Sequence, residues 1–230
     1  MITLKDHQVI PIEFMKNHRG LLLYHSTGSG KSLTALFSMY QFPNEIIIIG
    51  PKSSKKAFMD NIKISELDPS RVTFYTYTKI KKILEDKITF FKNKTVIVDE
   101  AHILRNSTMY NLYIASALQL ATKILLLTAT PVVNYMNDLI VLINIVKGDD
   151  VLPSDRKLFD QMFYNEEKME LINSDILYER IKNTISYYKI DDTVNYPTST
   201  NHYIDVVMSW QQIEEYIYYI KKIIYKMSFT

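Results

Sequence analysis

The stretch from Tyr24 to Ser32 combines residue types that bind the phosphate chain of a nucleotide; it reads Tyr24-His25-Ser26-Thr27-Gly28-Ser29-Gly30-Lys31-Ser32. Its glycines allow backbone conformations that turn successive N–H groups toward one anion. Lys31 can reach the β- and γ-phosphates, and the Ser32 hydroxyl can ligate Mg²⁺. A strand-like run precedes the loop and a helix-like run follows it, so the helix dipole adds positive potential. We predict a nucleotide site formed by Ser26, Thr27, Gly28, Ser29, Gly30, Lys31 and Ser32.

The loop departs from the usual pattern at its first position, where His25 stands in place of glycine. Taken alone, the stretch is also compatible with a glycine-rich turn that binds no ligand. The placement of the lysine-serine pair between a strand and a helix favours the phosphate loop.

Two adjacent acids, Asp99 and Glu100, follow another apolar, strand-like run and precede His102. At a strand end, Asp99 can hold Mg²⁺ next to Ser32, usually through a water. Glu100 can orient and deprotonate an attacking water. A solvated turn is the alternative for such a pair, and a histidine alone is an ordinary surface or core residue. Because the acids follow a phosphate loop, we predict Lys31, Asp99, Glu100 and His102 as catalytic residues, with Ser32 and Asp99 as metal ligands.

The next strand-like run ends in Thr128-Ala129-Thr130-Pro131. Its hydroxyl groups can hydrogen-bond toward the acidic pair and sense the state of the γ-phosphate. A threonine-rich turn before proline is also common between elements of any fold. The place of this turn in the series of strand ends favours a coupling role for Thr128 and Thr130.

These candidate residues must be positioned by strands and helices that alternate through the first 147 residues. Strands are predicted at 21–24, 46–49, 72–77, 95–98 and 124–127, and helices at 4–15, 31–40, 55–64, after 77, and at 109–120. The β-branched run 46–49 is typical of a strand buried on both faces of a parallel sheet. We therefore predict an α/β fold, a parallel sheet flanked by helices, with ligands at the carboxyl ends of the strands.

The pattern changes near residue 147. The chain becomes helical and charged over 154–183, with a strand-like piece at 185–188, a strand at 203–208 and a terminal helix at 210–227. We expect three regions: a nucleotide-binding lobe at 1–147, a mainly helical insertion or linker at 148–200, and a start of, or connection to, a second lobe at 201–230.

The composition excludes several classes of site. The 230 residues, 47% of them hydrophobic, suffice for a sizeable core, and the absence of cysteine excludes disulfides and thiolate chemistry. A net charge of +2 does not by itself indicate nucleic-acid binding, so that prediction depends on local clusters. We recognise no signal peptide and no membrane-spanning run, and therefore expect a cytoplasmic protein that is not secreted and has no membrane partner.

Six motifs follow one another in order: His7-Gln8, Ser26 to Ser32, Gly50-Pro51-Lys52, Thr76-Tyr77, Asp99-Glu100-Ala101-His102 and Thr128-Ala129-Thr130-Pro131. In this order, residues 1–147 resemble the first RecA-like lobe of a superfamily 2 helicase or translocase with an Asp-Glu-Ala-His box. Asn106 and the segment from Pro131 to Leu142 favour the Swi2/Snf2 side. A closer resemblance is to helicase-like ATPases of large cytoplasmic DNA viruses, of the poxvirus nucleoside triphosphate phosphohydrolase I and early transcription factor small-subunit types.

The resemblance implies a RecA-like, P-loop NTPase sheet and the cofactors ATP and Mg²⁺. It implies that Gln8 reads the adenine edge, for which a glutamine amide has matching donor and acceptor groups; a helix-surface glutamine is the alternative. It also implies a nucleic-acid face formed by Lys52, Lys55, Thr76 and Tyr77, among further lysines after the same strand ends. The alternative for these lysines is a solvated charged face.

Enzymes of this type close ATP between two RecA-like lobes, and the second supplies arginine fingers worth about 10³–10⁵ in rate. Only Arg156 and Arg180 follow residue 147, without a second set of βαβ units. We therefore expect the second lobe to lie elsewhere, in the same or a partner chain. We also expect these 230 residues alone to hydrolyse ATP poorly.

The sequence thus predicts the ATP-binding lobe of an ATP-dependent nucleic-acid helicase or translocase, a viral transcription or genome-processing factor that acts on DNA or RNA. A viral RNA polymerase is a further expected partner, and the expected location is the host cytoplasm, a viral factory or the virion. Two alternatives stay open: a nucleotide-dependent docking module with little hydrolysis, and a restriction-type or phage helicase lobe. The choice of DNA or RNA, the polarity, strand separation and the role of 154–183 are also open.

Overall fold

The computed structural model describes residues 3–105, 108–132, 137–165, 168, 170–190 and 207–227, with backbone alone at 137 and 220–227. Residues 1–190 and 191–230 form two compact units. None of the described helices combines the length and apolar character that crossing a bilayer requires. The elements, in chain order, are α1 (Asp6–Asn17), β1 (Gly20–His25), α2 (Lys31–Tyr40), β2 (Ile46–Ile49), α3 (Ser54–Ile64), η1 (Pro69–Arg71), β3 (Val72–Tyr75), α4 (Tyr77–Asp86), β4 (Thr95–Val98), η2 (Ala101–Arg105), α5 (Met109–Leu118), β5 (Lys123–Thr128), α6 (Asn137–Lys147), α7 (Arg156–Phe163), β6 (Tyr164–Asn165), β7 (Glu170–Leu171), α8 (Ser174–Ile181), β8 (Ile185–Tyr188) and α9 (Trp210–Met227).

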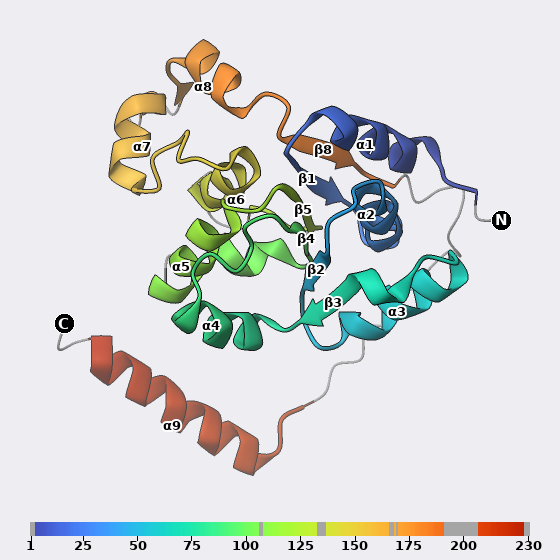
Figure 1. Ribbon diagram of the computed structural model, residues 1–230. Helices are drawn as coiled ribbons and strands as arrows, with labels where there is room; N and C mark the ends of the chain where they lie inside the picture. Colours follow the sequence, from blue (N-terminus) through green and yellow to red (C-terminus); the bar gives the residue numbers. More distant parts are fainter. Residues whose placement is uncertain are drawn as a thin grey trace. The chain divides into compact units, whose positions relative to one another are not determined.

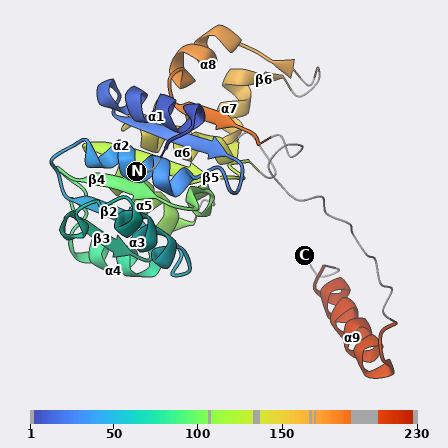
Figure 2. The same ribbon diagram turned by 90° about the vertical axis from the view of Figure 1, so that its right-hand side faces the viewer.

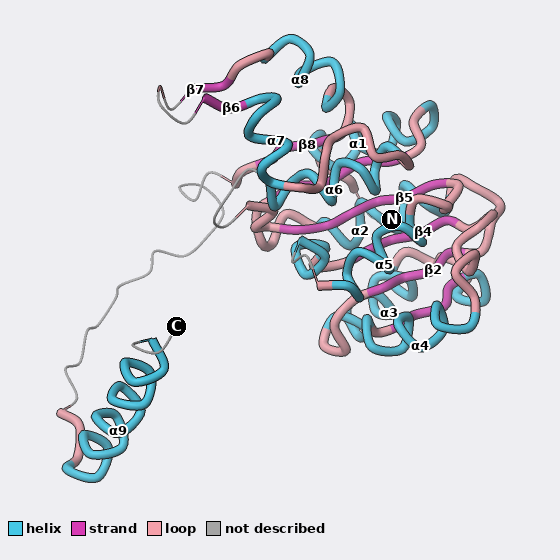
Figure 3. Tube along the Cα trace, turned by 90° about the vertical axis from the view of Figure 1, so that its left-hand side faces the viewer, coloured by secondary structure: helices cyan, strands magenta, loops and turns pink. Residues whose placement is uncertain are grey.

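A six-stranded sheet forms the centre of the first unit. Its strand order is β3-β2-β4-β5-β1-β8, and every neighbouring pair is parallel. Strands β5, β4 and β2 are seen one below the other in Figure 3. Since the strands are parallel, the segments that follow β1, β2, β4 and β5 all emerge at the same edge of the sheet. The predicted α/β fold is confirmed.

Helices cover both faces of this sheet (Figures 1 and 2). The helices α1, α2 and α3 contribute Met15, Leu36 and Phe58 to one core cluster, while α4, α5 and α6 supply residues of a second cluster on the opposite face. The isoleucines of β2 divide between the clusters: Ile46 and Ile48 belong to the first, and their neighbours in sequence to the second. This two-sided burial explains the unbroken apolar run in the sequence.

A third apolar cluster joins α6 to the helices that follow it. Ile140 and Ile143 of α6 are buried with Phe159 and Phe163 of α7 and Leu177 of α8. Other α6 residues belong to the cluster on the sheet, so this helix is buried on two sides. The helical region after residue 147 is thereby packed onto the lobe through α6 (Figure 1).

The helical stretch expected over 154–183 contains two helices, α7 and α8, which a two-stranded antiparallel ladder of β6 and β7 separates. Asn173 ends the interruption with a positive φ of 52°, a conformation that asparagine tolerates better than most residues. Its side-chain amide donates to the carbonyl of Met162 at 2.7 Å, which holds the two sides of the interruption together.

The strand-like piece at 185–188 is confirmed as β8. It pairs with β1 from Leu22 opposite Ile185 to His25 opposite Tyr188, at the edge of the main sheet. The first compact unit therefore extends through the sixth strand to residue 190, beyond the boundary expected at residue 147.

Several element ends differ from the predicted ones. The strand predicted at 72–77 ends at Tyr75, because the Thr76 side chain caps α4 and accepts a hydrogen bond from the backbone N–H of Lys79 at 3.3 Å. The strand predicted at 203–208 falls mostly outside the described residues, and Val207 and Met208 are not in a strand. The terminal helix is confirmed as α9. Asn106 and positions 133–136 also lie outside the described residues.

Arginine and lysine side chains donate hydrogen bonds to carbonyls at the C-terminal ends of helices. These bonds lie at the edge of the sheet opposite the carboxyl ends of the strands. The Arg19 guanidinium donates to carbonyls of both α5 and α6. The Lys123 amine donates to the carbonyls of Met15 and His18 at the end of α1, and Arg71 donates to carbonyls at and after the end of α2. Such cations satisfy free carbonyls and oppose the negative end of the helix dipole.

Candidate functional site

The predicted phosphate loop connects β1 to α2 at the carboxyl edge of the sheet. Gly28 and Gly30 have φ values of 80° and 82°, in the left-handed region that glycine adopts without strain. A Cβ atom on Gly30 would lie 2.3 Å from Nε2 of Gln8. Glycine at position 30 is therefore favoured by the backbone conformation, and a larger residue would also require the Gln8 side chain to move.

The start of α2 has the properties of an anion-binding helix end. The backbone N–H of Thr34 donates to the carbonyl of Gly30 at 3.0 Å, which leaves the N–H groups of Lys31, Ser32 and Leu33 without intrahelical acceptors. No side chain caps this end. The buried hydroxyl of Ser29 also has no hydrogen-bond partner among the described residues. These groups fit a phosphate better than a closed turn.

The Lys31 amine lies across the loop, donating to the carbonyls of His25 at 2.8 Å and Ser26 at 3.1 Å. Burial lowers the pKa of Lys31, and the attraction of Glu100 and Asp99 opposes that change. The amine and the two acids therefore lie close enough to interact, although they come from loops after different strands.

The two acids occupy different environments. Asp99 is 8% exposed, and burial raises its pKa, while a hydrogen bond from the Ser54 hydroxyl acts in the opposite direction. The Glu100 side chain is 45% exposed, and its φ of 51° is unusual for a residue with a Cβ atom. The Asp99 side chain is thus buried in the turn after β4, and the Glu100 side chain is partly exposed to solvent.

The structure brings His102 together with the threonine turn. Its Nδ1 lies 3.1 Å from Oε2 of Glu100 and 3.1 Å from Oγ1 of Thr128. That same hydroxyl oxygen accepts from the backbone N–H of Thr130 at 3.1 Å. Arg105 donates to the Thr130 carbonyl at 3.3 Å. The end of β5 is therefore connected to Glu100 through one histidine.

Gln8 lies against the phosphate loop rather than on the open surface of α1. It is 6% exposed, its Oε1 accepts from the backbone N–H of Lys5 at 2.9 Å, and its Nε2 lies 3.5 Å from the Ser29 carbonyl. The neighbouring His7 reaches the same carbonyl with Nε2 at 2.9 Å. The predicted adenine contact of Gln8 stays a prediction.

The donor set near the loop suits a magnesium ion that arrives with a nucleotide. Among the described residues there is no group of three His, Cys, Asp or Glu side chains that could form an all-protein metal site. Mg²⁺ commonly keeps several waters and binds one or two protein groups together with substrate phosphates. The Ser32 hydroxyl and the Asp99 carboxylate are groups of that kind.

The predicted nucleic-acid residues fall into two sets. Lys52 and Lys55 are exposed after β2, at the same edge as the phosphate loop. The Tyr77 hydroxyl instead donates inward, to the carbonyls of Asp99 at 2.8 Å and Glu100 at 3.3 Å. Its burial raises the pKa of the phenol well above the ordinary value. Tyr77 therefore supports the acidic turn, while Thr76 serves as the helix cap described above.

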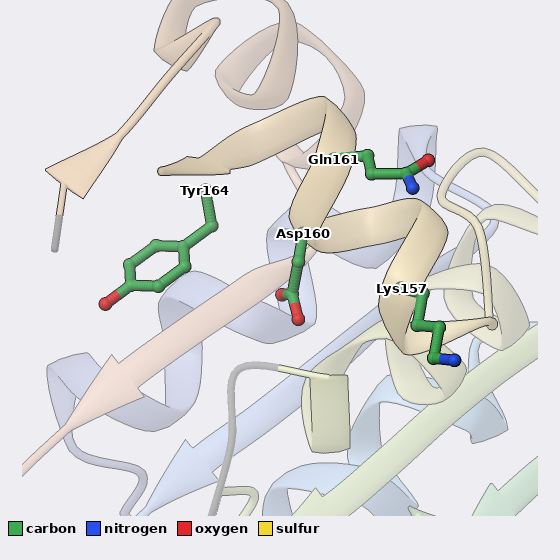
Figure 4. Close-up of a pocket in the computed structure, with 4 residues that line it drawn as sticks. All are labelled: Lys157, Asp160, Gln161 and Tyr164. Atoms are coloured by element: carbon green, nitrogen blue, oxygen red, sulfur yellow. The ribbon is translucent and has the colours of Figure 1, made fainter. Parts of the chain in front are cut away.

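Sequence reasoning missed the residues that hold these groups in place. The Ser54 hydroxyl, which donates to the Pro51 carbonyl at 2.9 Å, lies beside Asp99, and Ser186 and Tyr188 of β8 contact the phosphate loop. No short motif marks them, because their roles depend on the order of strands in the sheet. A separate surface hollow contains no predicted site residue (Figure 4); it is lined by Lys157, Asp160, Gln161 and Tyr164.

Comparisons with known proteins agree with this geometry. A model of the SNF2-related domain matches residues 44–229. The chain is 69% identical over 224 residues to "Putative ATP-dependent RNA helicase L538" of Acanthamoeba polyphaga mimivirus, covering 97% of this chain and 50% of that protein. It is 26% identical over 246 residues to "Nucleoside triphosphatase I" of Amsacta moorei entomopoxvirus, covering 94% of this chain and 38% of that protein.

The fold has a solved counterpart. The SWI2/SNF2 ATPase core of Sulfolobus solfataricus in complex with dsDNA superposes with a TM-score of 0.63 at 17% identity, over 82% of this chain and 45% of that one. The chain spans half or less of the length of these relatives. The predicted resemblance to viral helicase-like ATPases is confirmed, and this chain belongs to the SNF2-related domain family.

Proposed function

We propose that this chain is the ATP-binding lobe of a nucleic-acid translocase or helicase that hydrolyses ATP with Mg²⁺. The observation that carries the proposal is the position of the Lys31 loop and of the turn with Asp99 and Glu100 after parallel strands, at the same carboxyl edge of the sheet; the charges of both acids oppose the lowering of the Lys31 pKa by burial. A lysine on a phosphate loop facing two acids is the arrangement that phosphoryl transfer requires. The direct test is the binding of Mg²⁺-ATP by variants of Lys31 and Glu100.

In the proposed reaction, the free N–H groups at the start of α2 and the Lys31 amine bind the phosphates. Ser32 and Asp99 would hold Mg²⁺, and the bound ion would supply positive charge beside the phosphates. The exposed Glu100 carboxylate orients a water and takes its proton. His102, which contacts both Glu100 and Thr128, couples a movement of Glu100 to the turn with Thr128 and Thr130. Gln8 contacts adenine.

Nucleic acid is the proposed partner at the surface formed by the loops after β2 and β3. Lys52 and Lys55 are exposed there, and phosphate contacts of this kind supply most of the sequence-independent affinity for DNA or RNA. The similarity to viral helicase-like proteins supports a viral role for this chain, which we propose to be in transcription or genome processing. The proposed location is the host cytoplasm, a viral factory or the virion. A second RecA-like lobe and a viral RNA polymerase are proposed further partners.

Replacing Lys52 and Lys55 together by alanine is expected to weaken duplex DNA binding and its dependence on salt. Each lost phosphate contact reduces the slope of log affinity against log salt by about 0.9, so the double variant should lose up to about 1.8. Fluorescence anisotropy with a labelled duplex at several salt concentrations measures this slope.

The matched control replaces Lys87 and Lys92 by alanine. This double substitution makes the same change in net charge at the opposite edge of the sheet. Both are exposed, at the end of α4 and before β4. This control should bind DNA as the unaltered chain does. Equal losses in both double variants would show only a general effect of net charge and would contradict the proposed surface.

A further inference from the structure

The phosphate loop is bonded through Ser26 to the last residue of β8 and to the segment that follows it. The N–H of Ser26 donates to the carbonyl of Tyr188 at 2.9 Å, and the N–H of Ile190 donates to the Ser26 hydroxyl oxygen at 3.2 Å. The first of these bonds continues the parallel pairing of β1 and β8 into the loop, and the second adds a contact of the Ser26 side chain. The loop is therefore held from the side of the sheet edge as well as by α2.

His25 adds a side-chain link to the same strand. Its ring is fully buried, and Nε2 lies 2.9 Å from Oγ of Ser186, which is diagonal to it across the two strands. Its Nδ1 is buried without a hydrogen-bond partner among the described residues. Burial, with the charges of His7 and Lys31, lowers the pKa of His25 to about 4, so the ring is neutral at pH 7.

The backbone does not explain why histidine stands where the loop pattern has glycine. His25 is not among the residues with positive φ, so its conformation is open to any side chain. Burying an imidazole with one unpaired nitrogen has a free-energy cost. The hydrogen bond to Ser186 offsets part of this cost.

His25 also touches the lysine of the site, since its carbonyl accepts from the Lys31 amine at 2.8 Å. On the other side, the ring of His7 stacks on Tyr188 at 3.8 Å between centroids, while Nε2 of His7 lies 2.9 Å from the Ser29 carbonyl. Two histidines thus connect β8 with the first and the middle residues of the loop.

We propose that His25 is a positioning residue that ties the phosphate loop to β8 through Ser186 and thereby places the Lys31 amine for nucleotide binding. The proposal rests on the proposed nucleotide site and adds a residue to it. It makes the affinity for nucleotide depend on the pairing of the last strand of the sheet.

The test is calorimetric titration of Mg²⁺-ATP into the 230-residue chain and its variants. We expect His25→Gly and Ser186→Ala each to weaken binding about fivefold, the factor typical of one intramolecular hydrogen bond. The double variant should also lose about fivefold, because both changes remove the same bond. His25→Gln, which keeps a polar group at similar reach, should stay within about twofold of the unaltered chain.

Ile185→Ala is the matched control, because neighbouring residues of a strand point to opposite faces. Its binding should equal that of the unaltered chain, and far-UV circular dichroism on all variants checks that they are folded. Three results would overturn the proposed role of His25 and leave the nucleotide site standing. They are unchanged affinity in Ser186→Ala, additive losses in the double variant, and full affinity with glycine at position 25. Failure of the unaltered chain to bind Mg²⁺-ATP at millimolar concentration would overturn the proposed nucleotide site, and this inference with it.

Discussion

The Lys31→Met variant is expected to lose Mg²⁺-ATP binding by about 10- to 100-fold, because hydrogen bonds from a charged group contribute about 1.5–3 kcal/mol. Methionine keeps the bulk of the side chain and removes the charge. Calorimetric titration measures the affinity, and Lys55→Ala, an exposed lysine outside the loop, serves as the control. Affinity within about threefold of the unaltered chain would place the nucleotide elsewhere.

The same substitution should leave the unliganded chain at least as stable. Burial lowers the pKa of Lys31, so the unfolded chain holds this proton more readily than the folded one. At neutral pH the charge therefore opposes folding, and its removal stabilises the folded state. A loss of binding without a loss of stability separates a binding role of Lys31 from a structural one.

Glu100→Gln is the comparison that separates binding from chemistry. The amide keeps the size of the side chain but cannot take a proton from water, so turnover should fall by about 10²-fold or more. Binding of Mg²⁺-ATP should stay within about threefold. Phosphate release in the presence of nucleic acid measures the turnover, and unchanged turnover would contradict the assigned base.

The Arg19→Ala variant is expected to reduce the free energy of unfolding by about 3 kcal/mol, because a charged donor that bonds several helix-end carbonyls contributes more than a neutral one. The guanidinium donates to Ile145 and Val146 at 2.7 and 2.8 Å, and to Leu118 and Gln119 at 3.3 and 2.6 Å. These carbonyls end α6 and α5, so one side chain fastens two helices.

Urea unfolding followed by far-UV circular dichroism measures the change. Tryptophan fluorescence is unsuitable, because Trp210 is the single tryptophan and lies in α9, outside the first compact unit. Arg19→Lys should recover no more than about half, since an ammonium group lacks the planar fork of donors. Arg156→Ala, which removes an exposed arginine paired with Asp160, is the control and should change stability by less than about 0.5 kcal/mol. A loss below that value for Arg19→Ala would contradict the role of the guanidinium.

Features that depend on short stretches of chain were predictable from the sequence. The helix at 31–40 and the strands at 46–49 and 95–98 follow from local periodicity and turn residues, and the structure has these bounds. The roles of Gly30 and of the acids after β4 were also predictable, because each belongs to a short motif of neighbouring residues that act on the same phosphate group.

Features that depend on the order of strands were not predictable in this way. The strand at 185–188 could be recognised, but its place beside β1 follows from pairing between distant segments. The same applies to His25, whose partner Ser186 is brought to it only by that pairing. Tyr77 was expected on the nucleic-acid face, yet its hydroxyl donates into the acidic turn, because the start of α4 lies next to the end of β4.

The most direct test of the account is whether Ser32 and Asp99, on loops after different strands, act on one metal-bound nucleotide. The quantity to measure is the gain in ATP affinity on adding Mg²⁺, in the unaltered chain, Ser32→Ala, Asp99→Asn and the double variant. We predict that each single substitution removes most of the gain and that the double variant loses little more. Independent, additive losses, or an undiminished gain in Asp99→Asn, would contradict a shared site at the carboxyl edge of the sheet.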